Sequence, residues 1–429
     1  MPCFRIITLG CKVNQCESAF LEHELEKAGW KKVEKGKAAD LFIINTCIVT
    51  QKASHQSRQE IRRAIKENPK SDVIVTGCYA QVYPEELLGI KGISLIVGNK
   101  GKEKIPELVN KLSSLKQKIL VETFSRKEPF VCMNTDRFLN RSRAFLKIQD
   151  GCESFCSYCI VPYARGPYRS MKKEDVLQSI EKLLEKGYKE VVLTGIHLGK
   201  YGIDTGESLE ELLKEIGKQN YPLRIRLSSI EPNEISDMLI ELVAEQKFLC
   251  KHFHIPLQSG DNRILKRMNR KYTREQFYEL ISKIKKKIPF AGIGTDVMVG
   301  FPGEDEEAFR NTLSLVKELP LSYMHVFPYS DRPKTAAFYF KDKVSSEIIK
   351  KRAKMLREIA EKKKEEFLKL CNKKVFEVVV ESKYQNGFLR GITENYIKVI
   401  FPSADKKKGE YLKVQIEGSK KGIALGRVV

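Results

Sequence analysis

Short apolar runs alternate with helical patterns over the first 110 residues of the chain. Four runs have the length of buried strands: residues 4–9, 41–46, 73–77 and 94–99. Apolar positions at helical spacing lie between them, near residues 18–29, 54–67 and 84–88. Alternation of this kind is typical of a parallel sheet with helices on both faces. We therefore expect a doubly wound α/β domain over residues 1–112.

The same alternation resumes after a polar, weakly periodic stretch that we interpret as a linker, residues 113–137. Six further strands are predicted at residues 144–149, 190–195, 223–229, 251–257, 292–300 and 323–330. Helices are predicted between them at residues 173–186, 208–218, 233–245, 273–287 and 304–319, and one long helix follows at 345–370. Six successive strand–helix units predict a partial parallel (βα)6 barrel over residues 138–370.

The last part of the chain, residues 371–429, loses the helical pattern. Five short β-type runs follow one another there, separated by Gly, Asn and charged turns. Short strands without helices predict a small, all-β, OB-like barrel as a third domain.

The net charge of the chain indicates what kind of partner it binds. The 429 residues include 77 Lys and Arg against 55 Asp and Glu, a net charge of +22. Such a basic excess favours a polyanionic partner, most often a nucleic acid. The longest apolar runs, such as "LFIINTCIV", are too short to span a bilayer, so we expect no membrane association and a cytosolic location. In a reducing compartment the 11 cysteines are expected to be ligands, catalysts or buried residues rather than disulfides.

Three of these cysteines form one compact motif, "GCESFCSYC" at residues 151–159. Cys152, Cys156 and Cys159 follow the first predicted barrel strand, and active sites of parallel barrels lie on the loops after the strands. Structural zinc sites usually have four protein ligands, and no second pair follows within the usual reach. An iron–sulfur cluster held by three thiolates would leave one iron open. The spacing therefore favours a cluster, with zinc as the alternative.

A second group of cysteines is scattered in sequence but regular in position. Cys11, Cys47 and Cys78 each follow a predicted strand of the first domain. Ligands of open parallel sheets bind outside the carboxyl ends of the strands, so these three loops could bring three thiols together. The remaining cysteines are interpreted as packing or incidental residues: Cys3, Cys16, Cys132, Cys250 and Cys371.

The motif "CESFCSYC" resembles the signature of the radical S-adenosylmethionine (SAM) superfamily. The segments at 156–170, 255–273 and 294–304 resemble its methylthiotransferase branch, and the likeness extends over essentially the whole chain, with a C-terminal TRAM-like barrel. The resemblance implies two 4Fe–4S clusters: a SAM-binding cluster on Cys152, Cys156 and Cys159, and an auxiliary cluster on Cys11, Cys47 and Cys78. It also implies two SAM molecules per turnover, one for the radical and one for the methyl group.

The stretch "TLGCKVNQ" at residues 8–15 resembles the branch that acts on threonylcarbamoyladenosine in tRNA. The implied reaction converts C2–H of that nucleoside, beside the anticodon, to C2–SCH₃. The implied partners are the tRNA anticodon stem-loop and a flavodoxin- or ferredoxin-type reductant, with an unknown sulfur donor and a monomeric enzyme. The same chemistry on isopentenyladenosine or on a ribosomal-protein aspartate is one alternative. A non-catalytic, zinc-containing RNA-binding protein is an alternative of another class.

Several residues outside the cysteines are candidate contacts, and none is predicted to be catalytic beyond the cluster ligands. The expected SAM contacts are Tyr158, Gly195, Glu231, Gln258 and Asp296. The expected RNA contacts are Arg165, Arg169, Phe388, Arg390, Tyr396 and Lys398, since aromatic stacking and basic residues commonly hold RNA loops. His197 follows a barrel strand and could point into the site, although a lone histidine is more often structural; His252 and His254 are interpreted as packing or hydrogen-bonding residues.

Overall fold

The computed structural model describes the whole chain except residues 116–117, 139–140, 385–386 and 403–407. It divides into two compact units, each assembled from separate stretches of the sequence. Unit 1 comprises Met1–Leu139, Phe145–Met171 and Ser330–Phe338, and unit 2 comprises Asn140–Ala144, Lys172–Tyr329 and Tyr339–Val429. Both cysteine groups therefore belong to unit 1.

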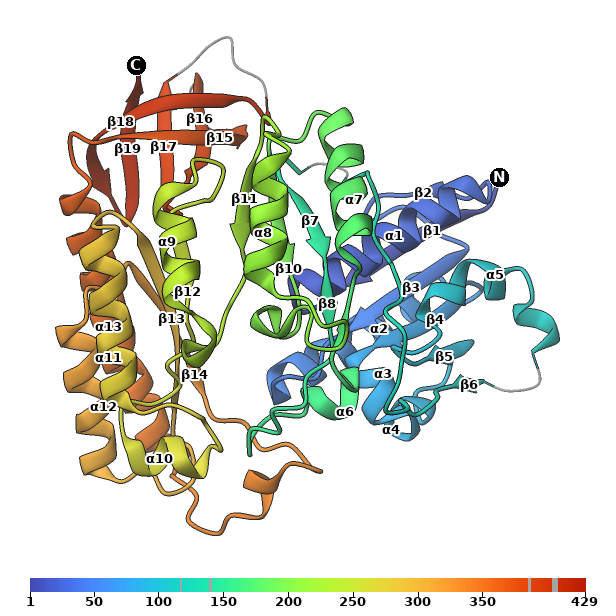
Figure 1. Ribbon diagram of the computed structural model, residues 1–429. Helices are drawn as coiled ribbons and strands as arrows, with labels where there is room; N and C mark the ends of the chain where they lie inside the picture. The colour runs from blue at the N-terminus through green and yellow to red at the C-terminus, as the bar shows by residue number, and fades with distance from the viewer. Residues whose placement is uncertain (116–117, 139–140, 385–386, 403–407) are drawn as a thin grey trace. The chain divides into compact units, whose positions relative to one another are not determined.

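A six-stranded sheet forms the centre of unit 1, and all of its strand pairs are parallel (Figure 1). In spatial order the strands are β2 (Lys31–Lys32), β1 (Cys3–Thr8), β3 (Leu41–Thr46), β4 (Asp72–Gly77), β5 (Leu95–Val97) and β6 (Ile119–Leu120). The helices are α1 (Lys12–Lys27), α2 (Gln51–Glu67), α3 (Cys78–Val82), α4 (Pro84–Leu88) and α5 (Ile105–Val109), with 3₁₀ turns η1 (Lys102–Lys104) and η2 (Leu112–Ser114).

Each face of this sheet has its own hydrophobic core. On one face Leu21 and Leu25 of α1 pack with Phe4, and Ile105 of α5 joins the same cluster. On the other face Ile61 of α2 packs with residues of α3 and α4 against Phe42 and Ile44. Alternate strand residues thus point to opposite cores, which is why the strands are continuously apolar in sequence.

The second part of unit 1 carries the cysteine motif. It contains β7 (Ala144–Lys147), β8 (Gln149–Asp150), α6 (Val161–Arg165) and β9 (Arg169–Ser170), and β8 pairs with β9 in antiparallel fashion. The 3₁₀ turn η5 (Ala336–Tyr339) lies at the end of the third stretch. Ile160 and Ala164 join the core beneath α3, so α6 packs directly on the N-terminal sheet domain.

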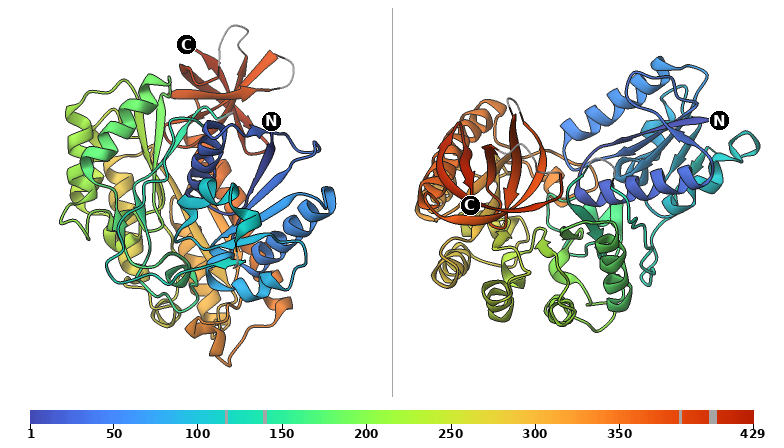
Figure 2. Two further views of the ribbon diagram at one scale, coloured as in Figure 1. Left: turned by 90° about the vertical axis from the view of Figure 1, so that its right-hand side faces the viewer. Right: turned by 90° about the horizontal axis from the view of Figure 1, so that it is seen from above.

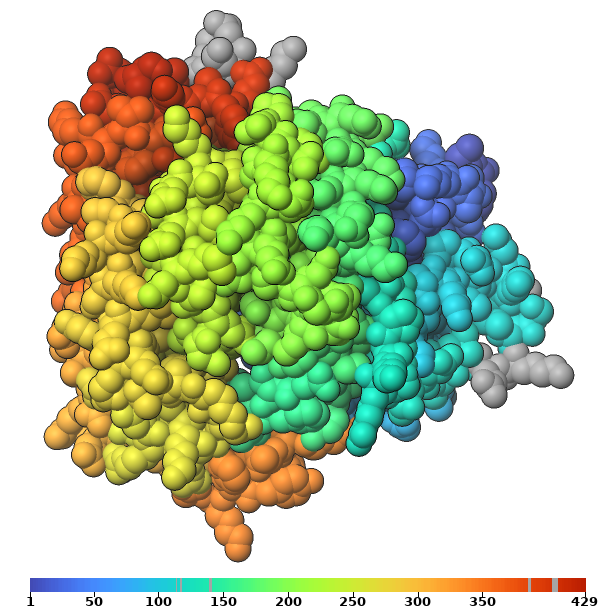
Figure 3. All heavy atoms as spheres, viewed as in Figure 1, coloured from blue at the N-terminus to red at the C-terminus, as the bar shows by residue number. Residues whose placement is uncertain are grey.

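Unit 2 contains most of the predicted barrel. Its strands are β10 (Glu190–Thr194), β11 (Arg224–Leu227), β12 (His252–His254), β13 (Gly292–Val299) and β14 (Tyr323–Pro328). Its helices and 3₁₀ turns are α7 (Lys173–Glu185), η3 (Leu198–Lys200), α8 (Leu209–Lys218), η4 (Pro232–Glu234), α9 (Asp237–Glu245), α10 (Asn262–Arg267), α11 (Arg274–Lys287), α12 (Glu306–Glu318) and α13 (Ser346–Leu370). Strand β10 pairs with β11, and β12, β13 and β14 pair in that order, all in parallel. Figure 3 shows that the green-to-yellow segment bearing α7–α11 forms much of the visible face of this unit.

The C-terminal strands of unit 2 close into a barrel of their own. In order around the barrel they are β15 (Val375–Lys383), β16 (Phe388–Thr393), β17 (Lys398–Pro402), β19 (Ile423–Val428) and β18 (Tyr411–Lys420). Figure 2 (right) shows these red strands curving around one another. Val378, Val399 and Phe401 fill the interior.

The predicted fold class is confirmed: a doubly wound N-terminal sheet, a partial parallel barrel and a small all-β barrel. All 15 runs that were predicted to be strands contain strands. The sequence missed β2, β6 and β9, which are two residues each, and β6 lies in the stretch expected to be a linker. It also started α1 at residue 18, whereas the helix begins at Lys12, directly after Cys11. Among the described residues, no helix is long and apolar enough to cross a membrane.

Candidate active site

The three N-terminal cysteines lie at the carboxyl ends of three adjacent strands. Cys11 caps the start of α1 just after β1, Cys47 follows β3 directly, and Cys78 follows β4 as the first residue of α3. Since β1, β3 and β4 are neighbours in the sheet, their ends lie side by side. The strand order therefore brings the three cysteine-bearing loops together, as the sequence predicted.

Two glycines let these strand ends approach closely. Gly10 has φ +96°, and a Cβ placed on it would lie 2.9 Å from the Cβ of Cys47. Gly77 has φ +99°, and its Cβ would lie 2.5 Å from the backbone nitrogen of Thr46. Any side chain at either position would push the loops apart, so the glycines hold the cysteine-bearing turns together.

An asparagine on α1 fixes the same turns by hydrogen bonds. The Asn14 side-chain amide donates to the carbonyl of Leu9 at 2.7 Å and to the carbonyl of Thr46 at 3.1 Å. The Asn45 amide donates in return to the carbonyl of Asn14 at 3.0 Å. The end of β1, the end of β3 and the first turn of α1 therefore form one hydrogen-bonded block around Cys11 and Cys47.

The electrostatics of this group suit a bound cation. Burial, together with the charge of the neighbouring Cys78, raises the pKa of the Cys47 thiol to about 12. Desolvation also raises the pKa of the Cys11 thiol. Thiols with raised pKa values become thiolates readily only when positive charge is bound beside them. Three such donors at one sheet edge match the protein ligands of an iron–sulfur cluster with one open position.

The second cysteine group lies in one loop between β8 and α6. Cys152 donates its backbone N–H to the Gly166 carbonyl at 2.9 Å, and Cys159 donates to the Cys156 carbonyl at 2.9 Å. Gly151 has φ +80°, and a Cβ there would collide with the Pro167 carbonyl oxygen at 1.7 Å. The three side chains are part-exposed, and the loop backbone is tied to the residues after α6.

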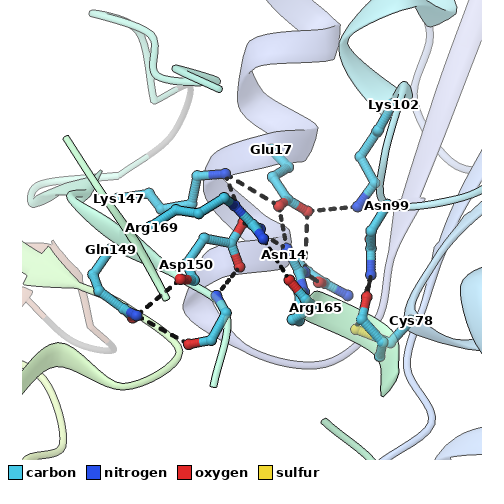
Figure 4. Close-up of polar contacts among 12 residues, drawn as sticks. Asn14, Glu17, Cys78, Asn99, Lys102, Lys147, Gln149, Asp150, Arg165 and Arg169 are labelled. Atoms are coloured by element: carbon cyan, nitrogen blue, oxygen red, sulfur yellow. Dashed lines mark hydrogen bonds and ion pairs between the residues drawn. The ribbon is translucent and has the colours of Figure 1, made fainter. Parts of the chain in front are cut away.

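A buried ion cluster links the two cysteine regions (Figure 4). Arg165, the last residue of α6, donates to both carboxylate oxygens of Glu17 on α1 and to Asn14 Oδ1 at 2.5 Å. Lys102 and Lys147 also bind Glu17. Burial by itself would raise the pKa of Glu17, but these cations hold it well below its ordinary value, so the carboxylate stays ionised.

The same cluster continues to Asp150, which is the last residue of β8 and precedes the cysteine loop. Asp150 accepts from Lys147 at 3.2 Å and lies 3.6 Å from Arg169. Arg165 and Arg169 were predicted to contact RNA, yet only 1% and 6% of their respective surfaces are exposed. This placement gives both arginines a role inside the protein, connecting the helix after Cys11 to the loop that carries Cys152.

One asparagine bridges the auxiliary cysteines and α6 directly. Asn99 Nδ2 lies 3.6 Å from the sulfur of Cys78 and donates to the carbonyl of Ala164 at 2.7 Å. The residue before Arg165 is thus anchored beside a cysteine of the N-terminal sheet. Neither Glu17, Lys102 nor Asn99 was identified from the sequence.

Four of the predicted SAM contacts lie in unit 2: Gly195, Glu231, Gln258 and Asp296. Glu231 pairs with Arg270, and burial raises the pKa of its carboxyl group. Gly195 follows β10. Gln258 adopts φ +62° and donates its backbone N–H to the carbonyl of Asp296 at 2.8 Å, so these two candidates are direct neighbours. The fifth candidate, Tyr158, is half-buried in the cysteine loop of unit 1.

The histidines of unit 2 are tied into polar contacts. His197 lies 2.8 Å from Glu234. His254 and His325 flank the Asp296 carboxylate at 3.1 and 3.2 Å, which holds its pKa below the ordinary value despite burial. His252 stacks on Tyr396 with ring centroids 4.4 Å apart. Tyr396, a predicted RNA contact, therefore packs against a strand of the parallel barrel.

The other predicted RNA contacts lie on the outside of the C-terminal barrel. Arg390 and Lys398 are exposed on the adjacent strands β16 and β17. Phe388 is 37% exposed and lines a pocket of about 370 Å³. The pocket is bounded by Tyr384, Phe388, Ile400, Lys420, Lys421, Ile423 and Leu425.

Comparison with known proteins agrees with this arrangement. Three family models match: "Uncharacterized protein family UPF0004" over residues 3–98, "Radical SAM superfamily" over 146–316 and "TRAM domain" over 369–429. The threonylcarbamoyladenosine tRNA methylthiotransferase MtaB of Aquifex aeolicus is 41% identical over 91% of this chain and 95% of its own length. The chain belongs to the radical SAM methylthiotransferase family. Its cofactors are therefore SAM and 4Fe–4S clusters, as predicted.

Other relatives show how far the likeness extends. The MtaB protein of Bacillus subtilis is 39% identical over 95% of this chain and 92% of its own length. A tRNA-2-methylthio-N(6)-dimethylallyladenosine synthase of Carboxydothermus hydrogenoformans is 35% identical over 97% of both chains. Among solved structures, the radical SAM methyltransferase TsrM of Kitasatospora setae matches with a TM-score of 0.58 and 15% identity, over 79% of this chain and 75% of that one. That last likeness concerns the fold alone.

Proposed function

We propose that this methylthiotransferase converts C2–H of N6-threonylcarbamoyladenosine, beside the anticodon of tRNA, to C2–SCH₃. The observation that supports it most is the pair of three-cysteine sites within one compact unit, one on a loop and one at three strand ends. The relatives named for threonylcarbamoyladenosine are 36–41% identical to this chain, and those named for dimethylallyladenosine are 34–36% identical. The substrate assignment rests on that difference and on "TLGCKVNQ".

Within this proposal each cysteine group has a separate task. Cys152, Cys156 and Cys159 hold the cluster at which SAM binds, and Cys11, Cys47 and Cys78 hold the auxiliary cluster that carries the sulfur. When bound, these groups supply a carbon-centred radical and a transferable sulfur. The protein's own part is to keep the two thiol sites at a fixed distance, and the Glu17–Arg165 ion pair and the Asn99 bridge are suited to that task.

The SAM contacts remain assigned to Tyr158, Gly195, Glu231, Gln258 and Asp296. Glu231 and Asp296 are carboxylates that could accept hydrogen bonds from an amino or hydroxyl group of SAM. Each already has cationic or imidazole partners: Arg270 for Glu231, and His254 and His325 for Asp296. These partners fix the orientation of the two carboxylates.

For tRNA, we propose that a base binds in the pocket beside Phe388. Aromatic and aliphatic side chains line the pocket, and Lys420 and Lys421 can meet the adjacent phosphates. Arg390 and Lys398 extend this basic surface over β16 and β17. Phe388→Ala should weaken tRNA binding by about 1–3 kcal/mol because a stacked base loses its platform.

A gel-shift or anisotropy titration with the cognate tRNA measures that loss. Tyr278→Ala is a matched control, since Tyr278 on α11 is 38% exposed, almost the same as Phe388. An equal loss in both variants, or none in Phe388→Ala, would remove the pocket from the proposal.

The proposal also includes the organisation and partners of the enzyme. The domains are residues 1–112, a linker at 113–137, the radical SAM barrel at 138–370 and the TRAM-like barrel at 371–429. The enzyme works as a monomer in the cytosol, where its tRNA substrate is, with a flavodoxin- or ferredoxin-type reductant. The sulfur donor is left unassigned.

Mass spectrometry of tRNA nucleosides tests the substrate. Deletion of the gene should remove 2-methylthio-threonylcarbamoyladenosine, and the plasmid-borne gene should restore it. Loss of the methylthio-dimethylallyl nucleoside instead would assign the chain to the other branch. Anaerobic purification should yield about eight irons and eight sulfides per chain. Zinc without sulfide would indicate the non-catalytic RNA-binding alternative.

A further inference from the structure

A buried arginine near the auxiliary cysteines forms no ion pair with any carboxylate of the described residues. Arg332, in the third stretch of unit 1, is only 5% exposed. Its Nη1 donates to Ser54 Oγ at 3.3 Å and its Nη2 to Ser330 Oγ at 3.1 Å, both neutral acceptors. Its Nε is buried and, among the described residues, has no hydrogen-bond partner.

Other buried arginines of unit 1 form ion pairs with carboxylates. Arg165 binds both carboxylate oxygens of Glu17, and Arg5 pairs with Glu67 at 2.5 Å. Among the residues that the structure describes, Arg332 forms no ion pair, and burial lowers its pKa below the ordinary arginine value. A buried charge without a counter-charge is strongly unfavourable, so an anion is expected beside it.

Hydrogen bonds connect the segment around Arg332 to the elements that carry Cys47 and Cys78. Ser54 lies on α2 one turn before Ser57, and Ser57 Oγ exchanges hydrogen bonds with the backbone of Cys47 at 3.1 and 3.4 Å. The Tyr83 hydroxyl donates to the Pro333 carbonyl at 2.6 Å, which ties the segment to the end of the helix that starts at Cys78. The Cys47 thiolate and, more weakly, the Glu86 carboxylate are among the charges that act on Arg332, although neither forms an ion pair with it among the described residues.

We propose that Arg332 is a positioning residue for the auxiliary cluster, in which its buried guanidinium offsets the negative charge of the cluster held by Cys11, Cys47 and Cys78. This inference rests on the proposed function, because it requires a cluster at those cysteines. The three thiolates make the cluster anionic, and Nε–H is a donor left over for a cluster sulfur or a thiolate. Since a nearby cation stabilises the reduced, more negative state, Arg332 raises the reduction potential of this cluster.

The proposal makes opposite predictions for the metal-free and the loaded protein. Without a cluster, Arg332→Gln removes an uncompensated charge and should raise the melting temperature by about 2–4 °C. With the auxiliary cluster bound, the same variant should lower the reduction potential and release iron faster. Arg332→Lys keeps the charge and should hold a potential close to that of the parent protein.

The experiment uses the full chain with Cys152, Cys156 and Cys159 changed to Ala, so that only the auxiliary site can hold iron. Differential scanning fluorimetry and an electron paramagnetic resonance redox titration measure the two quantities. Arg5→Gln is the control: it also removes a buried arginine, but one with a carboxylate partner, and should destabilise both forms without moving the potential.

If Arg332→Gln lowers the melting temperature of both forms, or leaves the potential of an intact cluster unchanged, the role of Arg332 is refuted while the proposed function stands. If the parent protein takes up no iron and sulfide at all, the auxiliary-cluster assignment fails, and the inference fails with it.

Discussion

Cys152, Cys156 and Cys159 share one loop, whereas Cys11, Cys47 and Cys78 come from the ends of three strands. The first group is positioned by local backbone hydrogen bonds, such as Cys159 N–H to the Cys156 carbonyl. The second depends on strand order and on glycines that let the loops touch. The loop site is therefore a local feature, and the strand-end site exists only in the folded sheet.

The two sites also differ in charge and exposure. The loop cysteines are part-exposed, whereas in the strand-end site Cys47 and Cys78 are buried and Cys11 is exposed. Arg165 interacts electrostatically with Cys78, and Arg332 with Cys47. An exposed open site suits a cofactor that must enter and leave in every turnover. A site with two buried cysteines and two nearby arginines suits a group that stays in place, which agrees with the separate tasks proposed for the two clusters.

The most severe way to test this division is to remove one loop ligand. Cys156→Ala should abolish both SAM cleavage and formation of the methylthio nucleoside, because two thiolates cannot hold the cluster at which SAM binds. Chromatography of 5′-deoxyadenosine after chemical reduction measures the first activity. Cys132→Ala, which removes an exposed cysteine of the same unit, should retain both.

Removing one strand-end ligand should separate the two activities. Cys47→Ala should still cleave SAM but form no methylthio product, and its iron content should fall by about half. Cys16→Ala is the control, since Cys16 is a fully buried cysteine on α1 outside the proposed ligands. Product formation at the parent rate in Cys47→Ala would contradict the assignment of the auxiliary site.

The ion cluster that joins the two sites should carry much of the stability of unit 1. Glu17→Gln leaves Arg165, Lys102 and Lys147 without their shared carboxylate and should cost about 3–5 kcal/mol. Urea unfolding followed by circular dichroism measures this loss. Glu67→Gln breaks the Arg5 pair at a carboxylate that is 25% exposed and should cost about 1 kcal/mol or less. Equal losses would mean that the cluster contributes no more than a surface pair.

The same comparison explains what could be predicted from the sequence. The loop motif is contiguous, and the strand-end cysteines follow clear apolar runs. Both cysteine groups and the fold could therefore be predicted from the sequence. Glu17 and Lys147 are 130 residues apart, and nothing in a local pattern shows that they meet. Arg165 was assigned to RNA because charge alone does not reveal whether a guanidinium faces water or a buried carboxylate.

The shortness of some strands also limited what could be predicted from the sequence. β2 and β6 have two residues each, too few for any periodicity, so β6 was taken as part of a linker. α1 was predicted to start at residue 18, because the turn at Lys12–Glu17 is polar on the side that the ion cluster occupies. Both misses lie where tertiary contacts, rather than local pattern, hold the chain.

The smallest effect concerns the reactivity of the thiols in the metal-free protein. With a pKa of about 12, Cys47 carries far less thiolate at pH 8 than an ordinary cysteine does. The higher intrinsic nucleophilicity of its thiolate offsets part of this, so alkylation by iodoacetamide should be roughly fiftyfold slower than at an ordinary thiol. Burial of the side chain acts in the same direction.

The pH dependence separates the effect of the pKa from that of burial. Between pH 8 and pH 10 the thiolate fraction of Cys47 should rise about a hundredfold, because both values lie below its pKa. An ordinary cysteine is mostly thiolate by pH 10 and should gain only a few-fold, so a short cysteine-containing peptide added to the sample serves as the reference. Peptide mass spectrometry reads both rates in one sample. If the two rates rose in parallel with pH, access of the reagent alone would limit the alkylation of Cys47. Burial would then not raise the pKa of its thiol, and the argument that this site requires a bound positive charge would fail.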